Sequence, residues 1–225
     1  MIVEEIFSSV QGEGVHIGTP TTFIRFVGCT RNCKWCDTGY GDVKREIPQK
    51  KLLNDVIIHN AMVLNNRHIV LTGGEPLVQK SDELMDLVTR LLAQDFYITI
   101  ETNGDIVPSE EFIEKVDLFS ISPKLSSAGD GRFMGDNLFN YHIRGANMSV
   151  KFVVDIDSAG DVSELLQYWD FFMEHKIRDF PIIVQPKDGK MEDVAELYEL
   201  LGCEVRKRRL AVQFLPQLHK VCAMK

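Results

Sequence analysis

Three cysteines, Cys29, Cys33 and Cys36, crowd into eight residues of this chain, and no other cysteine or histidine lies near them in the sequence. A structural zinc ion takes four protein ligands in a closed tetrahedral site, so three thiolates are one ligand short. Three thiolates can instead hold three irons of a [4Fe-4S] cluster and leave the fourth iron open to a small molecule. The C-x3-C-x2-C spacing therefore favours a reactive iron–sulfur site, with a partial zinc site or chance clustering as the alternative.

A glycine-rich turn is the second candidate for chemistry. Gly73, Gly74, Glu75 and Pro76 follow an apolar, strand-like segment. Glycines let a backbone approach a ligand closely, and the carbonyl groups and the Glu75 carboxylate can accept hydrogen bonds from an ammonium group. Alone, such a run is only a turn signal. Downstream of the cysteine motif, it indicates a loop that binds a small molecule.

Further polar residues stand where strand-like segments end. They are Thr72, Glu101, Ser122, Lys124, Gln185 and His219, with Pro123 between Ser122 and Lys124, and Lys151 lies inside such a segment. In parallel α/β folds the carboxyl ends of the strands form the rim of the active site. The pattern therefore predicts that these residues converge with the cysteines on one site.

The elements that must position these residues alternate between strands and helices. Strands are predicted at Thr22–Val27, His68–Leu71, Phe96–Ile100, Leu118–Ile121, Val150–Val154, Ile182–Val184 and Leu210–Phe214. Helical apolar stripes begin near Leu52, Leu84, Val162 and Val194, and Gly202 is expected to end the last helix. This alternation predicts a parallel sheet, with too few units for an eight-fold barrel. We expect an α/β fold, a partial (β/α)6-like barrel, as a single domain over residues 1–225, with an irregular insertion at about 126–145 that is a candidate lid.

The composition favours a small-molecule substrate. The net charge is −8 and the pI is about 5.3, whereas nucleic-acid-binding domains are basic. The one basic run, at 206–209, is interpreted as a solvated turn. No apolar stretch approaches the roughly 20 residues of a membrane helix, and the first residues do not resemble a signal peptide. We therefore expect no nucleic acid, no membrane contact and a cytoplasmic location.

The motifs together resemble the radical S-adenosylmethionine (radical SAM) superfamily, and more narrowly the 7-carboxy-7-deazaguanine synthase family. The resemblance rests on Ser8–Gly14, Phe23–Cys29, Cys36–Thr38, Ser122–Lys124 and Gln217–Lys220, and on the cysteine and Gly-Gly-Glu-Pro motifs. It runs from residue 8 to the last residue, with gaps in the helices and the insertion. It implies a barrel of the radical SAM type that converts 6-carboxy-5,6,7,8-tetrahydropterin to 7-carboxy-7-deazaguanine with loss of ammonia, in queuosine and 7-deazapurine biosynthesis.

The resemblance also implies the cofactors and partners. A [4Fe-4S] cluster and S-adenosylmethionine would form a 5'-deoxyadenosyl radical as the reactive species, so no side chain is assigned as catalytic. The cluster ligands would be Cys29, Cys33 and Cys36, and Thr38 would bind Mg2+. An electron donor such as flavodoxin or ferredoxin, and a homodimer, are implied as well.

The resemblance also implies two groups of binding residues, one for the substrate and one for the cofactor. The substrate would contact Val10, Gln11, Gly12, Glu13, Arg25, Thr72, His219 and the C-terminal carboxylate of Lys225. The cofactor would contact Trp35, Asp37, Gly73, Gly74, Glu75, Glu101, Ser122, Pro123, Lys124, Lys151 and Gln185. Arg25 would hold a substrate carboxylate through its planar guanidinium group. The Lys225 side chain departs from the small or apolar last residue associated with the family.

Plainer interpretations stand beside these roles. Arg25 could form a structural ion pair, Thr38 could cap a turn, Trp35 could serve packing alone, and His219 could be exposed to solvent. At the level of the whole chain, the alternatives are a glycyl-radical-enzyme activase of the same superfamily and a non-catalytic zinc-binding barrel.

Overall fold

The protein is described by a computed structural model that covers residues 1–36, 38, 45–63 and 67–224. These residues form one nine-stranded sheet with the strand order β3-β1-β2-β4-β5-β6-β7-β8-β9. The strands are β1 Ile2–Val10, β2 Pro20–Phe26, β3 Arg45–Glu46, β4 His68–Gly73, β5 Tyr97–Thr102, β6 Leu118–Ile121, β7 Met148–Val154, β8 Ile182–Pro186 and β9 Val212–Phe214. Neighbouring strands from β2 to β9 are parallel, and β1 is antiparallel to both β2 and β3.

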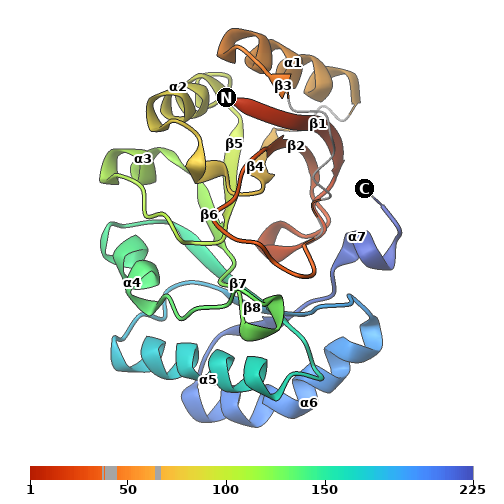
Figure 1. Ribbon diagram of the computed structural model, residues 1–225, viewed down its shortest axis with the longest axis vertical. Coiled ribbons are helices and arrows are strands. Elements are labelled where there is room, and N and C mark those ends of the chain that lie inside the picture. Colours follow the sequence, from red (N-terminus) through yellow and green to blue (C-terminus); the bar gives the residue numbers. More distant parts are fainter. Residues whose placement is uncertain (37, 39–44, 64–66, 225) are drawn as a thin grey trace.

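Helices follow the parallel strands along the chain and cover the outside of the curved sheet (Figure 1). The α-helices are α1 Gln49–Val63, α2 Ser81–Leu92, α3 Glu110–Lys115, α4 Gly135–Ile143, α5 Ala159–Glu174, α6 Met191–Arg208 and α7 Leu218–Val221, and the 3-10 turns are η1 Gly14–His16, η2 Pro76–Val78 and η3 Ser126–Ala128. Within the described residues β9 pairs only with β8, so the sheet stays open and α7 lies at the open side of the arc (Figure 1). The predicted partial barrel of parallel strands is confirmed.

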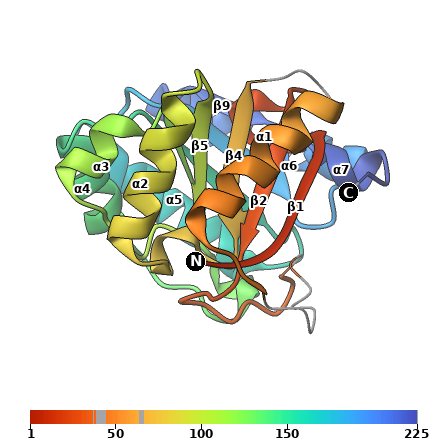
Figure 2. The same cartoon turned by 90° about the horizontal axis from the view of Figure 1, so that it is seen from above.

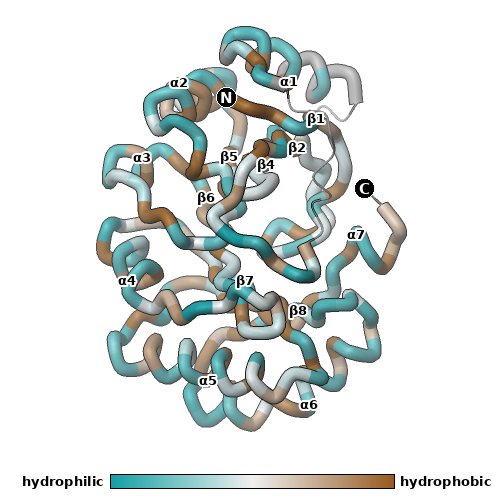
Figure 3. The backbone as a smooth tube through the Cα atoms, viewed as in Figure 1, coloured by the Kyte–Doolittle hydropathy of each residue, from teal (hydrophilic) through white to brown (hydrophobic). Residues whose placement is uncertain are grey.

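Along each strand, successive side chains point alternately to the apolar core beneath the helices and to the inner face of the curved sheet. Ile24 and Phe26 of β2, and Phe152 of β7, are fully buried in the apolar core that the helices cover. Arg25 and Lys151 are offset by one residue and point to the other face, because successive side chains of a strand alternate. Figure 3 shows hydrophobic and hydrophilic residues mixed along the chain, and Figure 2 shows α1 and α2 standing in front of the strands. None of the described helices combines the length and the apolarity that a membrane span requires.

Three sequence expectations need correction. Residues 126–145 are not irregular throughout, because η3 and the nine-residue α4 occupy much of the segment. Gly202 does not end α6, which continues to Arg208. The basic run at 206–209 is therefore the last turn of that helix and its cap, where positive charge interacts favourably with the helix dipole. The strand β1 was not predicted, because polar and apolar residues do not alternate regularly along it. It also lies toward the edge of the sheet.

A buried histidine at the start of β4 makes the stability of the fold depend on pH. His68 is hydrogen-bonded to the hydroxyl groups of Thr21 and Thr99 at 2.9 and 2.8 Å. Burial, with a smaller contribution from His16, lowers the pKa of His68 to about 4. The unfolded chain, with an ordinary histidine pKa of about 6.5, then binds more protons than the folded chain between pH 6.5 and 4.

We expect His68 to reduce the free energy of unfolding as the pH falls through this window, by about 2 kcal/mol between pH 7.5 and 5. His68→Gln should flatten this part of the pH dependence. Urea unfolding of both proteins across that range checks the prediction. Equal slopes for the two proteins would contradict it.

Candidate active site

One cavity of about 390 Å3 gathers residues from the cysteine loop, from strands β1, β2 and β4 to β7, and from the C-terminal segment. It is lined by Phe7, Val10, Gln11, Gly12, Glu13, Phe23, Arg25, Cys29, Arg31, Cys33, Trp35, Cys36, Thr38, Thr72, Gly73, Gly74, Glu101, Thr102, Asn103, Ser120, Ser122, Lys124, Lys151, Val153, Gln217, His219 and Met224. The volume is in the range of sites for small organic ligands. Its lining combines residues of the loops that follow the strands with inward-facing side chains of the strands themselves.

All three thiols of the loop after β2 line this cavity. Cys29 and Cys33 are half-buried and Cys36 is exposed. Burial raises the pKa of the Cys33 thiol, against the lowering effect of the Lys124 ammonium. In the described part of the chain, no three side chains of the usual metal-binding types lie close enough to share a single ion. The thiolates of a cubane bind separate irons and need not converge on one point, so the donor set fits a [4Fe-4S] cluster.

The glycines of the Gly-Gly-Glu-Pro turn hold the cysteine loop against the end of β4. The Gly74 amide donates to the carbonyl oxygen of Phe26 at 3.1 Å, and the Glu75 amide donates to that of Gly28 at 2.7 Å. A Cβ atom on Gly73 would overlap the backbone of Phe26, and one on Gly74 would overlap the carbonyl group of Gly28. Gly73 also has a φ of +123°, which favours glycine. The turn thus fixes the beginning of the cysteine loop by direct backbone contact.

Gly74→Ala is therefore expected to displace the cysteine loop. The overlap is with backbone, so we expect a loss of about 1–3 kcal/mol in the free energy of unfolding, as for other overpacked sites. Iron bound after anaerobic reconstitution should fall in parallel. Gly160→Ala is the matched control, because its Cβ would have no atom closer than 3.6 Å. It should leave the iron content unchanged and should not lower the stability, since alanine is favoured over glycine in a helix. A Gly74→Ala protein with normal stability and iron content would show that the contact is not needed.

Glu75 does not contribute to the cavity wall, which corrects the expectation that its carboxylate contacts the cofactor. The side chain is fully buried and accepts hydrogen bonds from Leu77 N, Thr102 Oγ1 and Asn103 N at 3.1, 2.9 and 2.8 Å. Burial raises the pKa of Glu75, and these hydrogen bonds oppose the shift. Glu75 therefore ties the end of β4 to the end of β5.

One end of the cavity, called the floor below, is formed by Gln11 and Glu13 of the loop after β1 together with Thr72 and Glu101. Gln11 Nε2 donates to Glu101 Oε1 at 2.9 Å, and Thr72 Oγ1 donates to Glu101 Oε2 at 2.8 Å. The amide of Glu13 donates to Gln11 Oε1 at 3.2 Å, which fixes the orientation of the Gln11 side-chain amide. These side chains therefore line the cavity with hydrogen-bond donors and acceptors whose orientations are fixed.

A buried ion pair joins this floor to β7. Lys151 Nζ donates to Glu13 Oε2, and the two side chains are 8% and 15% exposed. Burial alone would raise the pKa of Glu13, but the Lys151 ammonium outweighs it and the pKa is lowered. Lys124 donates to Ser122 Oγ at 3.2 Å and lies over the ring of Trp35, and its pKa is lowered first by burial and then by Lys151. The floor thus presents one carboxylate paired with one ammonium group, and Lys124 lies beside Trp35 of the cysteine loop.

The Arg25 side chain is held in place by two residues of β1, Glu5 and Phe7. Its guanidinium carbon lies 5.4 Å from the ring centre of Phe7, which stacks on Phe23, and Nη1 lies 3.3 Å from Glu5 Oε1. Nε is buried and has no hydrogen-bond partner among the described residues. Arg25 thus forms the structural ion pair that the sequence left open as an alternative, and its side chain also lines the cavity.

The C-terminal segment closes one side of the cavity. The Leu218 amide donates to the carbonyl oxygen of Gly12 at 2.8 Å, and the His219 ring packs where a Cβ of Gly12 would lie. Gln217 is 2% exposed, and its Oε1 atom is buried with no partner among the described residues. The close approach of His219 therefore depends on glycine at position 12.

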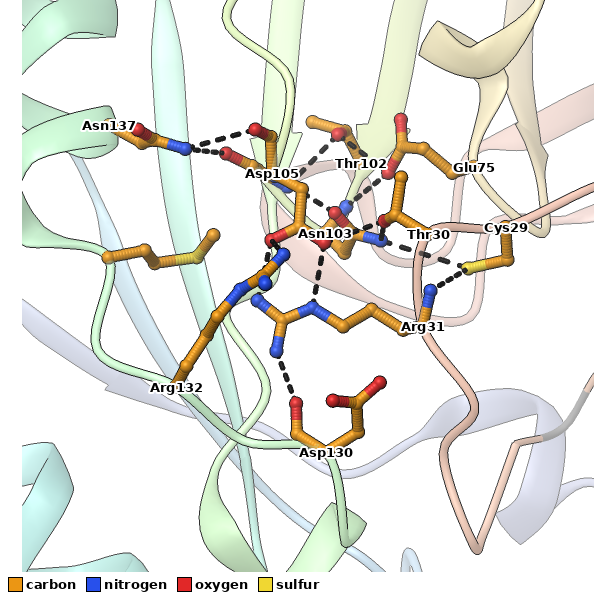
Figure 4. A network of polar contacts seen from close by, with 12 residues as sticks. Cys29, Thr30, Arg31, Glu75, Thr102, Asn103, Asp105, Asp130, Arg132 and Asn137 are labelled. Carbon is orange, nitrogen blue, oxygen red and sulfur yellow. Dashed lines mark hydrogen bonds and ion pairs between the residues drawn. The ribbon is translucent and has the colours of Figure 1, made fainter.

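A second network anchors the cysteine loop to the loop after β5 (Figure 4). Arg31 Nε and Nη2 donate to Asp105 Oδ2 and Oδ1 at 2.8 and 2.6 Å, with the two side chains 1% and 5% exposed. Arg31 also donates to the carbonyl oxygen of Asp130, and Arg132 Nη2 lies 2.9 Å from Asp105 Oδ1. Burial alone would raise the pKa of Asp105, but its hydrogen bonds to Arg31, Thr30 and Arg132 lower it to about 2.

Most of the predicted binding residues meet in the cavity. Besides Glu75, Pro123 and Gln185 do not line it, and Gln185 is fully buried with Nε2 donating to the carbonyl oxygen of Pro216 at 3.0 Å. Asp37 and Lys225 lie outside the described residues. Thr38 lines the cavity, and its hydroxyl lies 3.4 Å from the carbonyl oxygen of Gly73. Sequence reasoning missed Arg31, Asn103 and Gln217, although each lies in or beside a motif that it singled out.

This chain is similar to known proteins in sequence and in fold. A sequence model of the radical SAM superfamily matches residues 23–123. The 7-carboxy-7-deazaguanine synthase of Methanospirillum hungatei is 32% identical over 98% of this chain and 84% of its own length, and that of Aquifex aeolicus is 28% identical over 99% and 94%. The crystal structure of QueE from Escherichia coli superposes with a TM-score of 0.64 at 28% identity, over 95% of this chain and 93% of that one. SuiB from Streptococcus suis, at 19% identity and a TM-score of 0.60, shares the fold.

Proposed function

This chain belongs to the 7-carboxy-7-deazaguanine synthase family of radical SAM enzymes, and from that premise we propose how its cavity performs the ring contraction of 6-carboxy-5,6,7,8-tetrahydropterin. One observation carries the proposal. The three thiols, the Gly73–Gly74 turn and the polar floor line one continuous cavity. A radical formed at the cysteine loop would therefore lie within reach of a substrate held on the floor. Relatives matched over nearly the full length favour this function over an activase or a zinc-binding scaffold.

The cysteine side of the cavity would hold the cofactors. Cys29, Cys33 and Cys36 would bind the [4Fe-4S] cluster, and the backbone of Gly73 and Gly74 would lie against S-adenosylmethionine. When bound, this pair supplies a 5'-deoxyadenosyl radical that removes a hydrogen atom from the substrate. Trp35, which lines the cavity beside the Lys124 ammonium, would pack against the cofactor. Ser122 and Lys124 complete this side.

The floor would recognise the pterin. Gln11 and Glu13 present an amide and a carboxylate, which suit the alternating donors and acceptors of an aminopyrimidinone edge. Lys151 keeps Glu13 ionised, so the carboxylate accepts hydrogen bonds and does not donate one. Arg25 would bind the substrate carboxylate through its planar guanidinium group. Thr72 and His219 would contact the ring from two sides.

Thr38 would bind Mg2+ beside the substrate carboxylate, with water and substrate oxygens completing the shell. Thr38→Ala should weaken the dependence of the rate on Mg2+, and an unchanged dependence would contradict the assignment. A donor such as flavodoxin or ferredoxin, a homodimer and a cytoplasmic location stay predictions from the family.

An anaerobic assay with reductant, S-adenosylmethionine, Mg2+ and the carboxypterin tests the function. We expect 7-carboxy-7-deazaguanine and ammonia in equal amounts, with S-adenosylmethionine regenerated. No product from protein that carries about four irons and four sulfides per chain, the content of one cluster, would overturn the proposal. Stoichiometric 5'-deoxyadenosine would overturn the regeneration step.

A further inference from the structure

The side-chain amide of Asn103, at the end of β5, reaches from the backbone of its own loop to a cysteine sulfur. Nδ2 lies 2.9 Å from Thr30 Oγ1 and 3.8 Å from Cys29 Sγ, within reach of both through its two hydrogens. Oδ1 accepts from the Asp105 amide at 2.9 Å. The residue is 5% exposed, and its own backbone amide donates to Glu75 at 2.8 Å. Figure 4 shows these contacts converging beside Cys29.

The direction of this amide is determined by its neighbours. Asp105 N can only donate, so it must face the oxygen of Asn103. Thr30 Oγ1 donates its hydrogen to Asp105 Oδ2 at 2.6 Å, so it accepts from the nitrogen of Asn103. A flipped amide would place two donors face to face at Asp105 and two acceptors face to face at Thr30. An N–H group of Asn103 is therefore directed at Cys29.

We propose that Asn103 is a positioning residue that raises the reduction potential of the cluster by donating an N–H···S hydrogen bond to Cys29. The backbone amide of Arg31, 3.4 Å from the same sulfur, adds a second donor that mutation of side chains cannot remove. This inference rests on the proposed function, because Cys29 must be a cluster ligand.

The physical reason is the change of charge on reduction. One electron from a low-potential donor converts the cluster from the 2+ to the 1+ state, with no proton transferred. The added negative charge is shared with the thiolate sulfurs, so a donor directed at a sulfur stabilises the reduced state more than the oxidised one. Hydrogen bonds to the sulfurs are among the factors that set the potentials of such clusters. Because cleavage of S-adenosylmethionine requires the reduced state, Asn103 would make that state easier to reach.

A redox titration followed by electron paramagnetic resonance tests the proposal on reconstituted enzyme, with dithionite as the reductant. At a fixed solution potential, we expect Asn103→Ala to lower the ratio of reduced to oxidised cluster about threefold. Asn103→Asp, which also places a negative charge beside the sulfur, should lower it about tenfold, equivalent to about 59 mV for one electron.

Asn137 provides the matched control. Its Nδ2 atom donates to the carbonyl oxygens of Gly104 and Asp105 at 2.9 and 3.1 Å, so it holds the same loop without reaching the sulfur. Asn137→Ala and Asn137→Asp should change the ratio less than twofold. Ratios within twofold of the wild type for both Asn103 variants, or equal shifts from the Asn137 variants, would overturn the inference.

Iron analysis separates this inference from the proposed function. A wild-type protein that assembles no cluster would overturn the proposed function itself, whereas an assembled cluster with an unshifted potential would overturn only the role of Asn103. Should both Asn103 variants fail to hold iron, pulsed electron paramagnetic resonance on reduced enzyme with 15N in the asparagine side chains decides the matter. In an Asn32→Ser background, which removes the asparagine of the cysteine loop itself, a 15N coupling supports the hydrogen bond and its absence overturns it.

Discussion

Asp105→Ala is expected to lower the free energy of unfolding by about 3–5 kcal/mol, because it leaves the Arg31 guanidinium buried without its counter-ion. Arg31 and Asp105 are 1% and 5% exposed, so bulk solvent screens the charge of the unpaired guanidinium only weakly. The loop after β5 would also lose its contacts with Thr30 and Arg132. Chemical denaturation of the apoprotein and of the reconstituted enzyme measures the loss, and the iron content should decrease with it.

The exposed pair of Arg90 and Asp86 on α2 provides the matched control. It has a similar separation, 2.7 Å, but its side chains are 57% and 42% exposed. Asp86→Ala should therefore change stability by less than about 1 kcal/mol. The double variant Arg31→Met with Asp105→Leu should recover much of the loss, because it removes both charges. Equal effects of Asp105→Ala and Asp86→Ala would contradict the argument.

The Asp105 pKa of about 2 adds an acid dependence. An unfolded aspartate titrates near 3.9, so the stabilisation is complete above about pH 5 and is lost as the pH falls through 4 toward 2. Asp105→Ala should lack this component.

Lys151→Met is expected to lower kcat/KM at neutral pH by about 100-fold or more. The change leaves the Glu13 carboxylate buried without its cation, so the pKa of Glu13 should rise above its usual value. A protonated Glu13 would donate a hydrogen bond where the proposed substrate contact needs an acceptor. A loss of about 2.7 kcal/mol in transition-state stabilisation corresponds to this factor. Activity of the variant should increase with pH as Glu13 ionises, whereas the wild type should not show this step.

Two further variants isolate the cause. Lys151→Arg retains the positive charge and should lose much less activity than Lys151→Met. Lys187→Met removes a comparable ion pair, to Asp155 at 2.7 Å, that lies outside the cavity wall, and should leave kcat/KM nearly unchanged. A pH profile of Lys151→Met parallel to that of the wild type would rule out the proposed role of the pair.

Much of the fold was predictable because its signals are local. The seven parallel strands are short apolar runs, and the helices between them carry apolar stripes, so both patterns can be counted along the chain. The strand β1 escaped detection because its residues are stabilised by pairing with β2, a contact that no local pattern reports. The same strand holds Arg25 through Glu5 and Phe7, so these two partners of Arg25 could not be predicted either.

By itself, the sequence determined the fold class, the family and the chemical type of the site, because cysteine spacing and strand-end motifs are properties of neighbouring residues. Only the tertiary structure decided which of these groups face the cavity. It turned Glu75 inward to join two strand ends, placed Glu13 against Lys151, and directed Asn103 at Cys29. Such pairings join residues 27 to 138 positions apart in the chain, and their directions follow from how the sheet curves and which side chains alternate inward.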